Sequence, residues 1–123
     1  VDDLKGFLAS VAATLYSVAH FIFSIPHPCF YEQYKNMLGP SYSYMDCMVA
    51  EVSFSITRDQ YNRISGVPYH HRPLSDYINS IIGTGFELRE FYEVNPSEDI
   101  QKKYGGKWEF PRYCVFTCRK PIT

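Results

Sequence analysis

The sequence contains few cysteines, and their spacing is irregular. Cys29, Cys47, Cys114 and Cys118 are too few for a disulfide scaffold, and none of them lies in a CxxC pair. If residues 114 to 118 form a strand, Cys114 and Cys118 lie on one face about 13 Å apart, which is too far for a disulfide. We therefore expect reduced thiols.

Long apolar runs and basic clusters are also missing. No apolar run approaches the roughly 18 residues of a membrane-spanning helix, and the first residues lack the basic region of a signal peptide. Lysines and arginines are dispersed and the formal net charge is −1, which argues against electrostatic binding of nucleic acid or anionic lipid. These absences predict a cytoplasmic protein with no nucleic-acid or membrane partner.

The chain is rich in apolar residues. Of its 123 residues, 46% are hydrophobic and 17% are aromatic, which is enough for the core of one domain. The most apolar stretch, residues 20–30 (HFIFSIPHPCF), predicts a strand buried on both faces of a parallel sheet and ended by two prolines. Ligands bind where such a strand ends, and this segment offers Ser24, His27 and Cys29.

Periodicity predicts the remaining elements. Apolar residues recur at helical spacing from Leu4 to Leu15, after a capping Asp2 or Asp3, and from Leu74 to Ile82, after Pro73. Alternation predicts strands over residues 48–57, 86–94 and 113–119, joined before the last by a charged connection over 95–111. Cys114, Phe116 and Cys118 should share one face of the last strand.

Residues 31–65 are interpreted as an insertion or lid. With the segment that follows, they carry several tyrosines, which could grip a ligand or form an ordinary amphipathic surface. The four in question are Tyr42, Tyr44, Tyr61 and Tyr69.

Several pieces of the sequence resemble one family. The segments FIFSIPHPCF (21–30), HRPLSDYINSIIGTGFEL (71–88) and YCVFTCRKP (113–121), with the opening VDDLKGFLASVAATL, are similar to the carboxyl-terminal half of class I S-adenosylmethionine-dependent methyltransferases of the small-molecule type. The resemblance implies an α/β fold, namely part of a Rossmann-like sheet of order 3-2-1-4-5-7-6. This chain would supply strands 5, 6 and 7, the seventh antiparallel, with two flanking helices and a substrate-side insertion. Ser17-Val18-Ala19 departs from the family's Pro-Gly-Gly type of turn.

The resemblance also implies that the cofactor is bound by the half of the domain that this chain lacks. The family's cofactor is S-adenosylmethionine, but its glycine-rich loop belongs to the other half, and no GxGxG occurs here. No cofactor-binding residue can therefore be assigned, and we expect this chain alone to be inactive. Because one face and one edge of the 20–25 strand would be bare, we expect it to associate with the missing amino-terminal half or with itself.

The candidate site residues follow the predicted strand and precede the second helix. His27 could be a catalytic base, or its ring could simply hold the Pro26 to Pro28 turn. Candidates for contact with a small-molecule methyl acceptor are Ser24, Tyr69, His71 and Arg72. Arg72 could bind a carboxylate or phosphate, or form a surface ion pair. The spacing of the histidines and cysteines demands no metal site, so none is predicted.

Two other functions stay open. Cys29 and His71 could form a nucleophilic pair in a hydrolase or transferase. Alternatively, the chain could be a non-catalytic binding or oligomerisation module.

Overall fold

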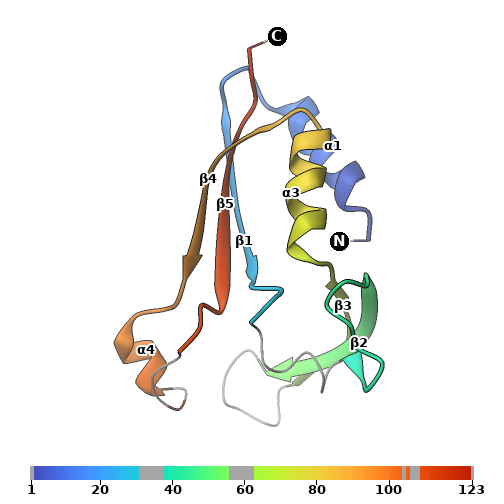
Figure 1. Ribbon diagram of the computed structural model, residues 1–123, viewed down its shortest axis with the longest axis vertical. Helices are drawn as coiled ribbons and strands as arrows, with labels where there is room; N and C mark the ends of the chain where they lie inside the picture. Colours follow the sequence, from blue (N-terminus) through green and yellow to red (C-terminus); the bar gives the residue numbers. More distant parts are fainter. Residues whose placement is uncertain (1, 31–37, 56–62, 104, 106–108, 123) are drawn as a thin grey trace. The chain divides into compact units, whose positions relative to one another are not determined.

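The computed structural model describes residues 2–30, 38–55, 63–103, 105 and 109–122. The elements in chain order are α1 (Leu4–Thr14), β1 (His20–Pro26), β2 (Met48–Ser55), β3 (Arg63–His71), α3 (Leu74–Gly83), β4 (Glu87–Val94), α4 (Glu98–Lys103) and β5 (Tyr113–Arg119) (Figure 1). Among the helices of these ranges, none is long and apolar enough to cross a membrane.

The chain divides into two compact units. The first unit combines Val1–Tyr31 with Leu74–Thr123, and the second is Glu32–Pro73. In the second unit β2 and β3 pair as a two-stranded antiparallel sheet. The predicted insertion, residues 31–65, includes residues 31–37 and 56–62, which lie outside the described residues. That this segment inserts at a substrate side, or acts as a lid, stays a prediction.

The first unit is built on a three-stranded sheet of order β1-β5-β4, with both pairings antiparallel. Phe23 of β1 and Phe91 of β4 both pair with Phe116 of β5, which fixes the register across the sheet. Because β1 and β4 are each antiparallel to β5, they run in the same direction. Their carboxyl ends therefore lie at the same end of the sheet, beside the start of β5 (Figure 1).

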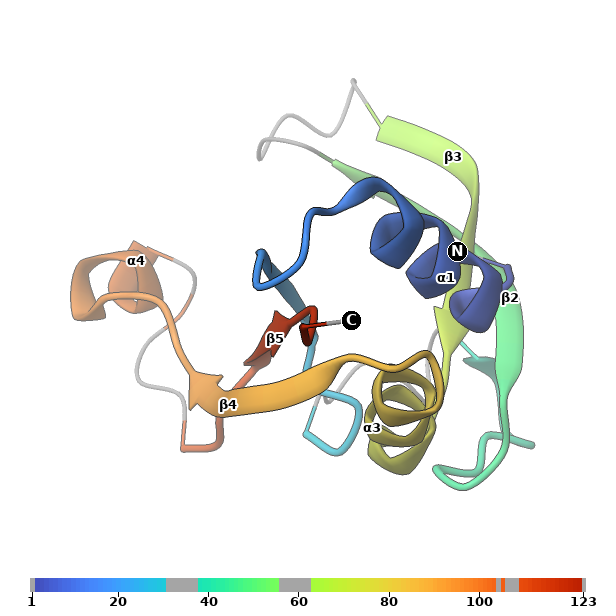
Figure 2. The same ribbon diagram turned by 90° about the horizontal axis from the view of Figure 1, so that it is seen from above.

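One face of this sheet carries the core. Cys114, Phe116 and Cys118 are fully buried, as the predicted alternation of residues 113–119 requires. Helices α1 and α3 lie over this face (Figure 2) and contribute Leu8, Tyr77 and Ile81 to the same cluster. Both predicted helices are confirmed, although Ile82, assigned to the buried stripe of the second, is exposed.

The ends of α1 are closed by side chains. The carboxylate of Asp3 accepts a hydrogen bond of 2.9 Å from the amide of Gly6, as expected of an N-cap. At the other end, the Lys120 ammonium donates to the carbonyls of Ala12 and Leu15 at 2.7 and 2.8 Å. These carbonyls lack partners within the helix, so Lys120 supplies what the helix end needs.

The turn that follows α1 has an unusual backbone. Val18 has a φ of +62°, a left-handed conformation that a β-branched residue rarely adopts. Hydrogen bonds hold it there: the Val18 amide donates to the carbonyl of Lys120 at 2.8 Å, and the Lys120 amide donates to Ala19 at 2.9 Å. This is the turn where the sequence departs from the family's glycine-containing pattern.

The surroundings of β1 correct one prediction. The strand was expected to be buried on both faces of a parallel sheet, but it pairs antiparallel with β5, and its side chains alternate between half-buried and exposed. Ile22 is 61% exposed. Phe21, Ile22, Phe23 and Ile25 form a short apolar run in the sequence, but only the odd-numbered residues, Phe21, Phe23 and Ile25, face the helices.

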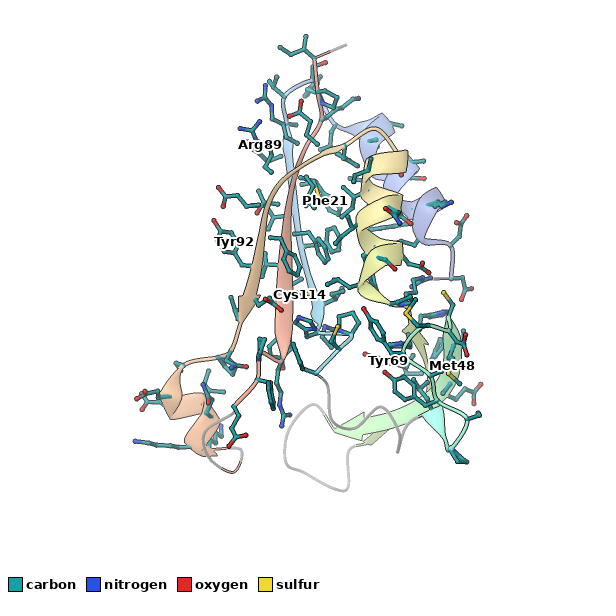
Figure 3. The ribbon with its side chains drawn as sticks, in the orientation of Figure 1. Phe21, Met48, Tyr69, Arg89, Tyr92 and Cys114 are labelled. Atoms are coloured by element: carbon teal, nitrogen blue, oxygen red, sulfur yellow. The ribbon has the colours of Figure 1, made fainter. Side chains whose placement is uncertain are left out.

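The opposite face of the sheet is the open face. It carries Ile22, Ser24 and Tyr92, because Ser24 and Tyr92 both pair with Val115, and Ile22 lies two residues before Ser24. Figure 3 shows Tyr92 pointing away from the side on which Phe21 lies. Within the described residues of the first unit, no helix covers this face.

Two elements were missed. The strand β3 contains Gly66 and Pro68, both unfavourable in strands. Residues 95–111 were expected to be a connection only, but they include α4, which has no buried residue. Acidic residues in the first turn of α4 and lysines in its last turn suit the helix dipole, and these ends stabilise it instead of an apolar stripe. The predicted strands at 48–57, 86–94 and 113–119 are confirmed as β2, β4 and β5, except that residues 56 and 57 lie outside the described residues.

Candidate functional site

The candidate site lies where β1 and β4 end. His27 follows the last residue of β1, and Glu93 lies one residue before the end of β4. The shared direction of these strands brings the two side chains together across β5, although 66 residues separate them. His27 Nε2 lies 2.6 Å from Oε2 of Glu93.

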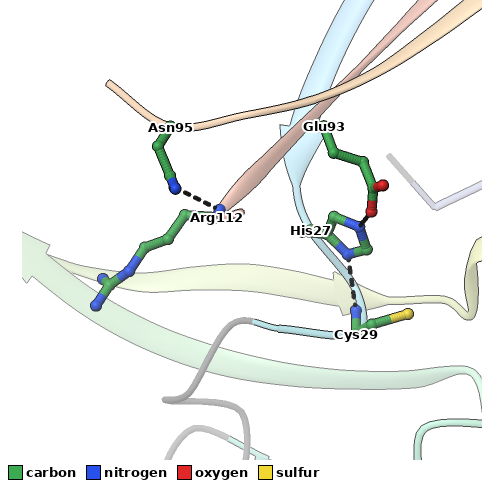
Figure 4. Close-up of polar contacts among 5 residues, drawn as sticks. All are labelled: His27, Cys29, Glu93, Asn95 and Arg112. Atoms are coloured by element: carbon green, nitrogen blue, oxygen red, sulfur yellow. Dashed lines mark hydrogen bonds and ion pairs between the residues drawn. The ribbon is translucent and has the colours of Figure 1, made fainter. Parts of the chain in front are cut away.

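Local hydrogen bonds fix the orientation of the His27 ring. The amide of Cys29 donates to His27 Nδ1 at 3.2 Å (Figure 4), so Nδ1 is the acceptor nitrogen of a neutral ring. The ring proton then lies on Nε2, which donates it to the Glu93 carboxylate. The backbone amide of His27 also donates to the carbonyl of Arg112 at 2.6 Å, which ties the turn to the start of β5.

The two partners differ in burial. The His27 side chain is 1% exposed, whereas the Glu93 side chain is 47% exposed. Both ring nitrogens of His27 are used by these bonds, and the ring is shielded from solvent. In this arrangement Glu93, and not His27, is the group that an external molecule can reach.

Aromatic rings flank the pair. The ring centroids of Phe30 and His27 are 4.8 Å apart. Phe110 stacks on Phe30, with ring centroids 5.2 Å apart and an interplanar angle of 11°. Both phenylalanines remain partly exposed, Phe30 by 37% and Phe110 by 53%. A carboxylate and an apolar aromatic surface therefore adjoin one another.

Of the two core thiols, Cys114 lies next to this site, paired with Glu93 across the sheet, whereas Cys118 lies four residues further along β5. Burial, with the nearby charges of Glu93 and Cys29, raises the pKa of Cys114 to about 12. Burial raises the pKa of Cys118 to about 11. Both groups are therefore neutral thiols at physiological pH and poor nucleophiles.

The side chains of two predicted residues of the first unit, Ser24 and Cys29, take no part in the His27 ring bonds. Ser24 is exposed on the open face of the sheet, opposite the face on which Glu93 lies beside Cys114. Cys29 is exposed, and the bond to His27 comes from its backbone amide rather than its thiol. The structure thus joins His27 to Glu93 rather than to Ser24.

The other predicted residues lie in the second unit. His71 is buried, its Nε2 lies 3.1 Å from the carbonyl oxygen of Tyr44, and the ring of Tyr42 packs edge-on against it at 5.1 Å. Tyr69 is half-buried on β3, and Arg72 follows that strand. Among the described residues, no three His, Cys, Asp or Glu side chains come together to hold a metal ion.

Glu93 is the residue that sequence reasoning missed. It lies in ELREFYEV, an alternating strand whose charged residues suggest only a solvated edge. The available signal was positional, since His27 and Glu93 both lie at the carboxyl ends of strands that, in the family's order 5-7-6, flank one common strand and run in the same direction.

The first unit is a mixed α/β unit in which His27 and Glu93 meet at the carboxyl ends of β1 and β4, two strands that run in the same direction. The fold of the chain matches a protein from Listeria monocytogenes assigned as an S-adenosylmethionine-dependent methyltransferase, with a TM-score of 0.69 and 18% identity over 99% of this chain and 57% of that chain. It also matches an S-adenosylmethionine-dependent methyltransferase from Mesorhizobium loti, with a TM-score of 0.60 and 18% identity over 97% of this chain and 56% of that one.

These matches confirm at the level of fold the resemblance found in the sequence. The chain has a fold similar to part of these methyltransferases and spans a little over half of their length. No protein-family model matches the sequence, and neither does any curated protein.

The described residues do not fit S-adenosylmethionine itself. S-adenosylmethionine is a nucleoside sulfonium without phosphates, and a Rossmann-like sheet binds such a ligand at a glycine-rich turn that follows the carboxyl end of a strand. Here β1 is followed by the proline-containing turn of Pro26 to Pro28, and the Gly83-Thr84-Gly85 sequence closes the end of α3 rather than opening a helix. No step through the cofactor is therefore assigned to these residues.

Proposed function

We propose that this chain is the acceptor-side portion of an S-adenosylmethionine-dependent methyltransferase that acts on a small molecule. The observation that carries the proposal is the sheet order β1-β5-β4 with β5 antiparallel to both neighbours. We assign β1, β4 and β5 to the family's strands 5, 6 and 7, because the family sheet ends in the order 5-7-6.

The bare edge of β1 supports this assignment. In the described residues β1 pairs only with β5, so its other edge presents unused backbone donors and acceptors. In the family order, strand 4 would pair there and bring the cofactor-binding half of the sheet beside it. Methyl transfer depends mainly on positioning the acceptor against the methyl carbon, and positioning is what the acceptor side would supply.

A chimera tests the proposal. Residues 1–123 would replace the matched part of the Listeria monocytogenes protein, and S-adenosylhomocysteine would be titrated calorimetrically into the chimera and into this chain alone. We expect the chimera to bind within tenfold of the parent affinity and the isolated chain to give no binding heat. A cooperatively folded chimera that does not bind would contradict the assignment, and so would one-to-one binding by the isolated chain.

A second function is favoured by the open face. Ile22 and Tyr92, exposed by 61% and 49%, lie on this face, and Ile22 also lies on the strand with the bare edge. A non-catalytic module that associates through this surface would also explain these features. Light scattering decides between the two: self-association that Ile22→Lys abolishes would favour the module, whereas a monomer at all concentrations would count against it.

A further inference from the structure

We infer that Glu93 and the adjoining aromatic pair form a binding site for a protonated amine that carries an apolar body. The inference rests on the proposed function, since it names the chemical class of the acceptor. The inference extends the proposed function by assigning recognition of the amine to Glu93, His27, Phe30 and Phe110.

The first step is the charge of the site. His27 is held as a neutral ring that donates from Nε2 to one carboxylate oxygen, Oε2. The pair therefore carries the single negative charge of Glu93. In the described part of the chain, Glu93 forms its ion pair with His27 and with no lysine or arginine, and the Arg112 side chain extends away from the ring in Figure 4. The Glu93 carboxylate is thus available to a cation from another molecule.

The second step is access and orientation. The Glu93 side chain is 47% exposed, while the ring that holds it is 1% exposed. A carboxylate anchored by a buried donor loses little rotational freedom when it binds a ligand. An ammonium group can approach the exposed part of the carboxylate and donate to it in a charge-assisted hydrogen bond.

The third step is the apolar surface beside the charge. Phe30 contacts the His27 ring and stacks on Phe110, and both phenylalanines are partly exposed. Aromatic faces attract cations and pack against apolar groups. An amine with an aromatic or aliphatic body would satisfy both parts of the site, whereas a carboxylate ligand would be repelled by Glu93.

The test uses the whole chain, labelled with nitrogen-15 and titrated at pH 7 with 2-phenylethylammonium. The comparison ligand is 3-phenylpropanoate, which has a similar body and the opposite charge. We expect the amine to shift the amide signals of Cys29, Phe30 and Glu93 and to bind at least tenfold more tightly than the anion. Equal binding of the two ligands, or no shift with the amine, would overturn the inference.

Two matched variants separate recognition from folding. Glu93→Gln keeps a carbonyl oxygen to accept from His27 Nε2 but removes the charge, so we expect a folded protein without the preference for the amine. Glu90→Gln removes a charge from the same strand at a position paired with Thr117, on the open face, and should leave the preference unchanged. A preference that survives in folded Glu93→Gln would refute the assignment. Because this assay uses neither cofactor nor methyl transfer, its failure would leave the proposed function standing.

Discussion

The ammonium group of Lys120 lies 2.7 Å from the carbonyl oxygen of Ala12, so a residue near the end of the chain caps its first helix. A second bond reaches Leu15 at 2.8 Å. The two bonds join the segment after β5 to the end of α1, which covers the core. The end of the helix is therefore held in place by the segment that continues the central strand of the sheet.

Replacing Lys120 by methionine should lower the free energy of unfolding by about 2 kcal/mol, because charge-assisted bonds to half-buried carbonyls are lost. Urea denaturation of the whole chain measures this. Lys102→Met, on the exposed helix α4, is the control and should change stability by less than about 0.5 kcal/mol. Equal midpoints for the two variants would show that Lys120 does not act as a cap.

Replacing Val18 by glycine should stabilise the chain by roughly 0.5 to 1 kcal/mol. A left-handed conformation costs a residue with a Cβ atom roughly 1 to 2 kcal/mol, and a β-branched residue is among the least suited to it. Glycine removes this cost, but it also lowers the free energy of unfolding by about 0.5 to 1 kcal/mol because it gives the unfolded chain more conformational freedom. Val18→Ala keeps the Cβ atom and should show no comparable gain. A thermal melt in which both variants behave alike would contradict the role of the backbone.

The stability of the chain should fall as the pH rises above 9. The ordinary thiol pKa is 9.0, whereas those of Cys114 and Cys118 are raised to about 12 and about 11 in the folded chain. Below pH 9 both states keep these protons and the full stability is present. Above pH 9 the unfolded state loses them first, so each thiol lowers the free energy of unfolding by about 1.4 kcal/mol per pH unit until its folded pKa is reached.

Denaturation midpoints between pH 8 and pH 11 test this expectation. The double variant Cys114→Ala/Cys118→Ala should be less stable at pH 8 because of the cavities it leaves, but its stability should fall less steeply with pH. Tyrosines and lysines titrate in both proteins, so the difference between the slopes is the readout. Identical slopes would mean that the buried thiols do not contribute.

Thiol labelling should distinguish two pairs of cysteines. Cys29 and Cys47 are exposed, whereas Cys114 and Cys118 are fully buried and have raised pKa values. Iodoacetamide at neutral pH should therefore modify the first pair in the folded chain and all four thiols in urea. Mass spectrometry of the digested protein assigns the sites, and rapid labelling of Cys114 under native conditions would contradict the packing described for β5.

The elements that sequence predicted best are those whose signal is local. Residues 113–119 alternate so regularly that the strand and its buried face follow from the sequence alone. The surroundings of β1 could not be predicted in the same way, because a short apolar run does not reveal what packs on each side of it. Helix α4 was not predicted because it has charged residues at its ends but no apolar stripe.

The sequence predicted one of the two residues at the centre of the candidate site. His27 was identified because it follows a strand, but its partner depends on the order of strands in the sheet. Glu93 meets it only because β5 lies between two strands that run in the same direction. Sequence patterns say which residues form strands, whereas the pairing of strands distant in sequence depends on the packing of the whole unit.

The two outer strands of the sheet are chemically unlike. The outer strand β4 carries four charged residues, which disfavour pairing of another strand along its outer edge. They are Glu87, Arg89, Glu90 and Glu93. Within β1 the residues from Phe21 to Ile25 carry no charge. Strand addition is therefore directed to one side only, so each chain can accept a single neighbour by this route. Two copies meeting at β1 would form a closed pair, and growth into a filament would stop there.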